Sequence, residues 1–349
     1  MTTETGGPQW RRIFAAPLIL LAVVVGLVLI WYNARSLLLL FAGILFSVFL
    51  DACTRGLGYV LPLTRAWRFG LVVLVLGSLA ILTLGWGIVR LPTQARMLFA
   101  VMDSQITVLE SWLATFGIDL FGPGGRHDLS QFLSDPGRLF GHVQYAVSGA
   151  YVFAITTTVI ICLGLFFAGQ PAAYREGLLV LMPQDTRPRM REVMNEMGQT
   201  LRNWLLGQLV RSAVVAVAIA MTLYSLGVPG AGLLGMQAGA ANFIPYLGPL
   251  IAALPVALAT MQLGLSTLAW VMVIYFLVQT IEGFVIAPLI QKGSVDVPPA
   301  WTLFAIVVLG AMFGAMGVAL AAPLLAVVRI GTLRLYVEGW LKDRSQGDA

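Results

Sequence analysis

Long apolar runs constrain this chain more than any other feature. Runs of about 20 apolar residues recur along its 349 residues, and an α-helix needs a run of that length to cross a bilayer. Backbone groups in lipid must be hydrogen-bonded within the protein, so lipid-facing runs fold as helices. The sequence therefore predicts an all-α polytopic membrane protein, with about seven or eight transmembrane segments that cross or enter the bilayer.

Composition and charge agree with a bilayer environment. The chain is 59% hydrophobic and 11% charged, with a mean hydropathy of +0.88, whereas a soluble domain carries about 25% charged residues. The net charge of +5 comes from basic residues that gather at segment ends, as the positive-inside rule describes. We therefore expect the lipid bilayer as a partner and no nucleic acid.

The first half of the chain contains four apolar segments that read as intact spans. They cover about 13–32, 36–50, 69–90 and 147–169, and residues 1–90 form an N-terminal scaffold. The first run ends in Trp31-Tyr32-Asn33 rather than in a small-residue cleavage site, so we read it as an uncleaved span instead of a signal peptide. Basic residues place the N-terminus in the cytoplasm: Arg11, Arg12, Arg55, Arg65 and Arg68.

Two amphipathic regions separate these spans from each other and from the rest of the chain. Residues 91–146 carry apolar side chains at helical spacing and are expected outside the cytoplasm, and the basic stretch 170–207 is expected inside. Both stripes fit helices that pack on their neighbours or lie in the interface. A dedicated partner-binding helix is the alternative reading.

The second half, 208–330, is apolar but repeatedly broken. After a fifth span over 208–227, the run 230–262 contains Pro245-Tyr246-Leu247-Gly248-Pro249, and each proline removes a backbone donor and clashes with the preceding turn. Broken backbone at membrane depth requires a covering of protein or water. We expect a re-entrant hairpin or discontinuous helix made of Gly230–Ile244 and Pro249–Met261.

Further apolar segments follow over 264–290 and 300–328, with a second break at 293–299. Arg329, Arg334, Lys342 and Arg344 place the C-terminus inside, so residues 331–349 are predicted to form a cytoplasmic tail. Gly310, Gly314 and Gly317 share one face of the last segment. Small residues at this spacing let helices pack closely. The alternative, more specific function of this face is a sliding or gating surface.

Glu282 and Asn242 are the polar residues that stand out. Glu282 lies with Gln279 in an otherwise apolar run, where an isolated carboxylate costs about 2–3 kcal/mol. It either accepts a proton or holds a cation, or it is structural and caps a broken helix or pairs with an arginine. Asn242, beside the Pro245 break, either binds an ion or polar solute or satisfies freed backbone groups.

No pattern in the sequence predicts an enzyme, a cofactor or a metal site. His127 and His142 both fall in the predicted extracytoplasmic region, and Cys53 and Cys162 lie far apart without redox or metal spacing. There is no nucleophile elbow, phosphate loop or dinucleotide fingerprint. These observations exclude ATP as a direct energy source and favour a function other than catalysis.

Several motifs, in their order along the chain, resemble those of the autoinducer-2 exporter family of bacterial and archaeal permeases. They are Gly207-Gln208, the run Asn242-Phe243-Ile244-Pro245-Tyr246-Leu247-Gly248-Pro249, the set Gln279, Glu282 and Pro288, and the closing run Gly310, Gly314, Gly317, Ala321 and Pro323. The N-terminal half matches in layout only. The resemblance implies a homo-oligomeric inner-membrane transporter with re-entrant hairpins in its C-terminal half.

Three functions fit these features. The first is a secondary transporter that exports a small polar solute such as autoinducer-2, through a pathway that includes Asn242, Pro245, Tyr246, Gly248, Pro249, Gln279, Glu282 and Pro288. The second is a Na⁺ or Li⁺/proton antiporter with Glu282 as its titrating group, although the segment lacks paired aspartates. The third is a non-transporting scaffold, which would not need prolines and a carboxylate inside its spans.

Overall fold

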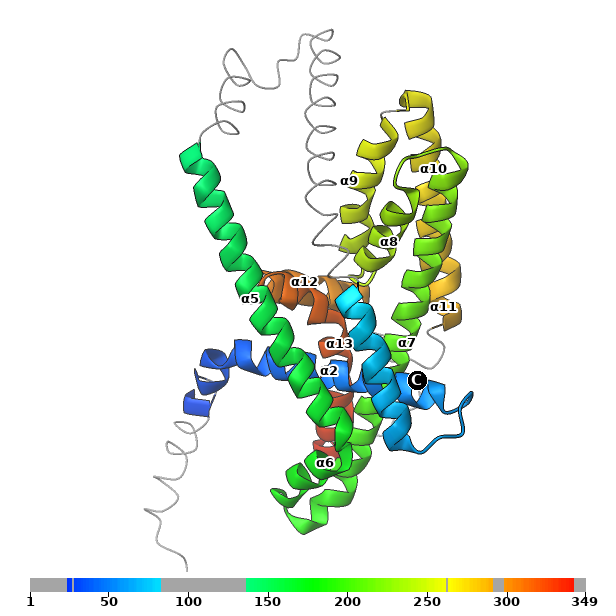
Figure 1. The fold of residues 1–349 in the computed structure, drawn as a ribbon. Helices are drawn as coiled ribbons and strands as arrows, with labels where there is room; N and C mark the ends of the chain where they lie inside the picture. The colour runs from blue at the N-terminus through cyan, green and yellow to red at the C-terminus, as the bar shows by residue number, and fades with distance from the viewer. Residues whose placement is uncertain (1–23, 27, 83–135, 262, 291–297, 342–349) are drawn as a thin grey trace, which may run out of the picture.

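The computed structural model describes residues 24–26, 28–82, 136–261, 263–290 and 298–341 (Figure 1). Within these ranges every regular element is helical. Six helices there are long and apolar enough to cross a membrane: Ala34–Leu57, Arg65–Leu82, Tyr151–Gly169, Gln184–Ser225, Leu265–Ile290 and Ala315–Gly339. Two shorter apolar helices accompany them, so the predicted all-α polytopic fold is confirmed. Most of the predicted span 13–32 and of the region 91–146 lies outside the described residues.

The labelled elements are all helical. Their order is α2 (Ala34–Leu57), α5 (Pro136–Gly169), α6 (Pro171–Val180), η1 (Gln184–Thr186), α7 (Arg187–Ser225), α8 (Ala231–Ala241), α9 (Leu247–Met261), α10 (Leu265–Ile281), η2 (Glu282–Ile286), α11 (Ala287–Ile290), α12 (Pro299–Phe313), α13 (Ala315–Gly331) and η3 (Thr332–Trp340).

Helix α7 organises the molecule. Its 39 residues correspond to a length of about 58 Å, nearly twice the hydrocarbon thickness of a bilayer. The predicted basic stretch 170–207 and the predicted span 208–227 therefore meet inside one continuous helix. In Figure 1, α8 lies beside the upper half of α7, whereas α6 lies beside its lower end.

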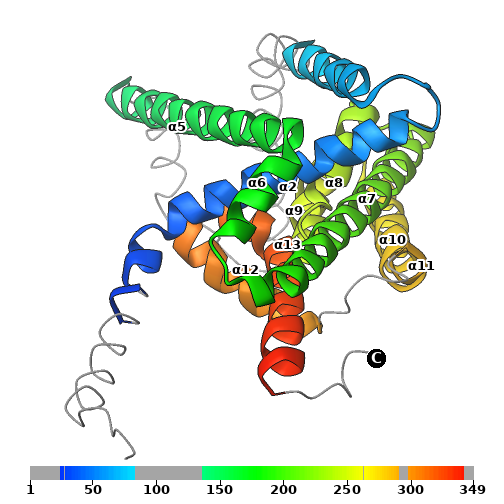
Figure 2. The ribbon, with the colours of Figure 1, turned by 90° about the horizontal axis from the view of Figure 1, so that it is seen from below.

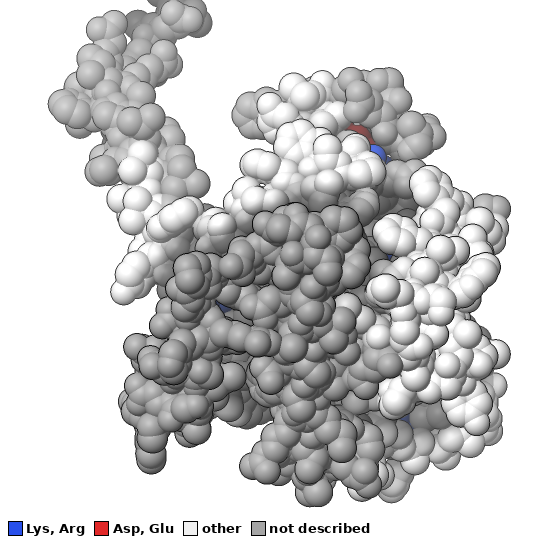
Figure 3. All heavy atoms as spheres, turned by 90° about the horizontal axis from the view of Figure 1, so that it is seen from above, with Lys and Arg blue, Asp and Glu red and all other residues white. Residues whose placement is uncertain are grey.

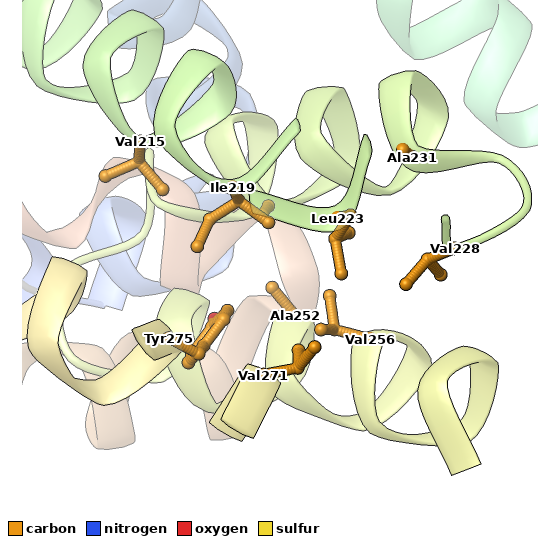
Figure 4. Packing of buried hydrophobic residues seen from close by; sticks show 10 residues of the cluster. Val215, Ile219, Leu223, Val228, Ala231, Ala252, Val256, Val271 and Tyr275 are labelled. Atoms are coloured by element: carbon orange, nitrogen blue, oxygen red, sulfur yellow. The ribbon is translucent and has the colours of Figure 1, made fainter. Parts of the chain in front are cut away.

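The upper half of α7 packs with α8, α9 and α10 around an apolar core. Val215, Ile219 and Leu223 of α7 point towards Val256 of α9 and Val271 of α10, and all five are nearly inaccessible (Figure 4). Glycines bring the backbones of α7 and α8 together: a Cβ added at Gly239 would lie 2.5 Å from the Ser212 carbonyl oxygen. This block holds the α8–α9 pair firmly against α7.

A second block surrounds α2. Seen from below, α2 runs between α5 on one side and the α12–α13 pair on the other (Figure 2). Gly43 of α2 packs on Leu163, and Gly164 of α5 packs on Phe46, so small residues again allow a close crossing. On the face in Figure 3, charged atoms of described residues are confined to a few small spots.

The broken segment 230–262 is a helical hairpin, as predicted. Helices α8 and α9 contain 11 and 15 residues, or about 16 and 22 Å, and neither is long enough to cross a bilayer core of about 30 Å. The turn between them covers 242–246. Both ends of the hairpin therefore lie towards the same side of the block.

The last apolar segment differs from its prediction. The sequence predicts one segment over about 300–328, whereas the structure has two helices, α12 and α13, that fold back on each other at Gly314. Gly314 has a φ of 64°, which glycine adopts without steric cost. Gly310 packs on Val318, and a Cβ at Gly317 would overlap the Leu309 carbonyl. The three glycines thus build a tight turn instead of one face of a single helix.

The segment 264–290 is also less regular than its sequence suggests. After α10, residues Glu282–Ile286 form a π-helical turn, and α11 follows. Pro288 explains this turn, because its ring clashes with the carbonyl four residues earlier, at Phe284, and it donates no hydrogen bond. The wider π turn begins at the one acidic residue of this segment, Glu282.

Candidate functional site

A buried ion pair joins α7 to the end of α10. The Arg211 guanidinium donates a short hydrogen bond from Nε to Glu282 Oε1, and the two side chains are 12% and 6% exposed. A buried charge without a partner is very costly, and in this contact each side chain is the charge partner of the other. Of the two structural readings of Glu282, pairing with an arginine is the one observed.

A second buried contact holds the hairpin turn. Gln208, one turn before Arg211 on α7, donates from Nε2 to the Asn242 carbonyl oxygen at 2.6 Å, and both residues are 2% exposed. The freed backbone at the break is thus satisfied by a side chain of α7 rather than by the side chain of Asn242. Since Gln208 and Arg211 share a face of α7, the hairpin turn and Glu282 approach the same helix surface.

Three side chains at this surface carry buried polar atoms without hydrogen-bond partners among the described residues. They are Asn242 Nδ2, Ser212 Oγ and both amide atoms of Gln279. Gln279 precedes Glu282 by three residues, so both lie on one face at the end of α10. Buried polar groups almost always have partners, so a concentration of unpartnered ones indicates a place for a polar ligand or water.

The hairpin turn itself is tight and strained. Tyr246 has a φ of 65°, a left-handed conformation that is costly for a bulky residue and is found where surroundings enforce it. A Cβ at Gly248 would overlap the Ala241 carbonyl, so this position requires glycine. The Pro249 carbonyl oxygen accepts a hydrogen bond of 2.6 Å from the Tyr275 hydroxyl of α10, which ties the turn to the next span.

The structure brings most of the predicted site residues together. Asn242, Pro245, Tyr246, Gly248 and Pro249 form the hairpin turn and the start of α9. Asn242 and Glu282 bond to neighbouring turns of α7, and Gln279 lies one helical turn before Glu282. Pro288 lies between one and two turns after Glu282 and affects the site through the π-helical turn that it causes. Gly310, Gly314 and Gly317 belong to the other hairpin and lie outside this polar cluster, which we define as Gln208, Arg211, Ser212, Asn242, Gln279 and Glu282.

Arg211 is the functional candidate that the sequence reading missed. A signal was present, because Arg211 is a charged residue inside the predicted span 208–227, and an intramembrane charge requires a partner. Its partner is 71 residues away in the chain. One positive residue in one apolar run and one negative residue in another is the sequence pattern that predicts such a pair.

A separate concavity lies outside the polar cluster. It is a pocket of about 220 Å³ between α2, α5 and the α12–α13 turn. Its lining is largely apolar, with Arg35 and Thr156 as the polar contributors. No residue of the polar cluster lines it.

Comparison with known proteins identifies the relatives of this chain. The family model described as AI-2E family transporter matches residues 18–335. YrrI of Bacillus subtilis, which is named as a transport protein, is 26% identical over 59% of this chain and 60% of its own length. A transport protein of Thermotoga maritima is 24% identical over 89% of this chain and 94% of its own length. PerM of Escherichia coli K12, which is named as a permease, is 22% identical over 92% of this chain and 94% of its own length.

Proposed function

The chain belongs to the AI-2E family of transporters, and on this premise we propose that it is a secondary transporter that exports a small polar solute similar to autoinducer-2. We place it in the prokaryotic inner membrane as a homo-oligomer with both termini in the cytoplasm. The observation that carries the site assignment is the polar cluster at the tip of the α8–α9 hairpin. Discontinuous helices that meet polar side chains near the bilayer midplane are typical transporter sites.

The chemistry of the polar cluster suits a neutral or weakly charged solute. Its side chains carry one positive and one negative charge, Arg211 and Glu282, in direct contact. The unpartnered amides of Asn242 and Gln279 and the hydroxyl of Ser212 supply both donors and acceptors. A polyhydroxylated solute can use such groups without requiring a counter-ion.

Sodium or lithium/proton antiport is the second candidate, and it rests on Glu282 as a buried carboxylate. A cation at Glu282 would have to displace Arg211 or lie beside its positive charge, and like charges at such a distance repel strongly. The Arg211–Glu282 contact therefore favours solute export over cation exchange. The two functions differ in a direct measurement, since antiport produces proton flux when Na⁺ or Li⁺ is added.

The test is a flux assay in vesicles of reconstituted protein, loaded either with autoinducer-2 or with a pH-sensitive dye. We expect efflux of autoinducer-2 from vesicles with the unchanged protein. Glu282→Gln removes the charge partner of Arg211 and should slow efflux by at least about tenfold, the effect of losing one hydrogen bond to a charged group.

The charge-reversed double variant Arg211→Glu, Glu282→Arg separates transport from folding. It retains a buried ion pair, so it should fold. The positive and negative charges exchange helices, however, so the solute would meet each charge in the wrong position. Loss of efflux with unchanged thermal stability supports the site. Full efflux from this double variant would show that the pair is structural only, and proton exchange without autoinducer-2 efflux would favour the antiporter.

A further inference from the structure

A cluster of arginines surrounds Asp51 where three apolar helices end. Asp51, in the last two turns of α2, accepts hydrogen bonds from Arg55 Nε at 2.8 Å and from Arg202 Nη2 of α7 at 2.9 Å. Arg65, which begins the helix Arg65–Leu82, lies 3.5 Å from the same carboxylate. Arg65 also donates to the Ala168 carbonyl oxygen near the end of α5 at 3.3 Å.

Arg68 completes this arginine cluster, which we define as Arg55, Arg65, Arg68 and Arg202. Its guanidinium lies directly against Gly58, because a Cβ at that glycine would overlap Arg68 Nη1. Gly58 follows the last residue of α2, so Arg68 lies at the helix C-terminus, where the partial negative charge of the helix favours a cation.

The arginine cluster carries more positive charge than the described residues neutralise. Among the described residues, Asp51 is the carboxylate that forms ion pairs with its members, so four positive charges face one negative charge. Arg68 Nε and Arg202 Nε are buried donors without hydrogen-bond partners in the described part of the chain. Both observations point to an anion that is bound from outside the protein.

The depth of the arginine cluster identifies that anion. It lies where the candidate spans Ala34–Leu57, Arg65–Leu82 and Tyr151–Gly169 begin or end, which is the level of the lipid headgroups. Tyr59, in the connection between the first two of these spans, is 93% exposed, and Trp67, in the first turn of the helix Arg65–Leu82, is 74% exposed. Tyrosine and tryptophan with this exposure are typical of the membrane interface.

We propose that the arginine cluster binds the phosphate of an anionic phospholipid, with Tyr59 and Trp67 in contact with the lipid around it. Guanidinium groups match phosphate oxygens in paired hydrogen bonds, and basic sites between membrane helices hold anionic headgroups in this way. The bound phosphate would join α2, α5, α7 and the helix Arg65–Leu82 through one anion.

The experiment compares lipids added to delipidated full-length protein in neutral detergent, with bound lipid counted by native mass spectrometry and stability followed by thermal unfolding. Phosphatidylglycerol should bind and raise the unfolding temperature, because a ligand of the folded state stabilises it. Phosphatidylcholine and inorganic phosphate should do neither. Equal effects of phosphatidylcholine, or of inorganic phosphate, would overturn the proposal.

Arg55→Gln with Arg68→Gln is the informative variant, because neither side chain holds two helices together through Asp51. At about fivefold per basic residue near the surface, the affinity for phosphatidylglycerol should fall about 25-fold. Arg191→Gln is the matched control. It removes one charge from an arginine that pairs with Glu176 instead, and it should leave lipid binding unchanged. An unchanged affinity in the double variant would contradict the proposal.

Asp51→Asn separates a lipid site from a purely structural ion-pair network, because the two predict opposite signs. Removal of the carboxylate frees three arginines and should raise the affinity for phosphatidylglycerol about fivefold, even as the unfolding temperature of the lipid-free protein falls. Loss of both lipid binding and stability in Asp51→Asn would show that the arginines only form a structural ion-pair network with Asp51.

Discussion

Gln279 is the residue whose chemistry separates function from stability most directly. Its amide is buried one helical turn from Glu282, and no described residue gives it a well-aligned hydrogen bond. An unsatisfied buried polar group costs about 1–3 kcal/mol. A chain selected only for a stable fold would carry an apolar side chain here, so the amide is expected to contact the transported solute.

Gln279→Leu tests this expectation. Leucine has a similar volume and no polar atoms, so the protein should unfold at the same or a higher temperature, by up to about 1–3 kcal/mol of added stability. Efflux of autoinducer-2 from reconstituted vesicles should nevertheless be lost. Thr280→Leu is the matched control, since Thr280 lies next in the chain but is exposed and bonds its own helix backbone. Normal efflux from Gln279→Leu would remove this residue from the site.

The sequence predicts part of this site and not the rest, for a physical reason. Asn242 and Glu282 stand out because polar residues in apolar runs are costly wherever they pack. The contacts that build the site join Gln208 to Asn242 and Arg211 to Glu282, which are 34 and 71 residues apart in the chain. Such pairings depend on how α7, the hairpin and α10 are packed, which local patterns do not contain.

Helix α8 depends on its close approach to α7. Gly239 packs against the backbone of Ser212, and Gly235 packs against Ala216 and Ala220. The spacing of four residues on both helices lets their backbones approach as in other small-residue membrane interfaces. This contact positions the turn that carries Asn242.

Gly239→Ala should therefore destabilise the protein and impair transport, because the added Cβ would lie 2.5 Å from the Ser212 carbonyl oxygen. Overpacking of this kind costs about 1–3 kcal/mol. Gly232→Ala, in the same helix, meets no atom within 4 Å and should be neutral or slightly stabilising, since alanine favours helix by about 1 kcal/mol over glycine. Thermal unfolding of the two variants measures the difference. Equal unfolding temperatures would show that α8 is not tightly held.

At the level of elements, the paired prolines of 245–249 were a better guide than single prolines or glycines, since Pro255 and Pro323 lie inside α9 and α13. Pro245 and Pro249 mark the α8–α9 break in the sequence because they cannot continue a helix. The α12–α13 break depends on Gly314 alone, and a glycine is compatible with both a helix and a turn. Similarly, α7 crosses from the polar to the apolar part of its sequence without a break, since neither part contains a helix-breaking residue after Pro188.

The described part of the molecule contains two helical hairpins whose turns approach a shared core. Phe243 from the α8–α9 turn and Phe313 and Met316 from the α12–α13 turn pack against the same group of buried residues, which includes Leu205 and Leu320. Helix α8 follows the apolar end of α7. Helix α13 instead leads into η3 beside the basic first part of α7, where Arg334 bonds Glu196 at 2.9 Å. The two hairpins therefore approach the shared core from opposite ends of α7, and we expect them to enter the bilayer from opposite sides, as inverted repeats do in transporters.

Single cysteines that react with a membrane-impermeant maleimide test this topology in intact cells, after Cys53 and Cys162 are replaced by serine. Leu226→Cys and Leu263→Cys lie at the two ends of the α8–α9 hairpin, and Ala300→Cys and Leu341→Cys lie at the two ends of the α12–η3 unit. All four positions are exposed.

The first pair should react in intact cells, and the second pair should react only after the membrane is permeabilised, because the basic start of α7 belongs in the cytoplasm. Reaction of Leu226→Cys and Leu263→Cys from opposite sides would mean that α8–α9 crosses the bilayer once, which helices of about 16 and 22 Å could do only if stacked end to end. Reaction of all four from outside would place both hairpins on one side. In the first case α8–α9 would not be a re-entrant hairpin, and in the second both hairpins would enter from one side, so either result would contradict the opposed arrangement expected for alternating access.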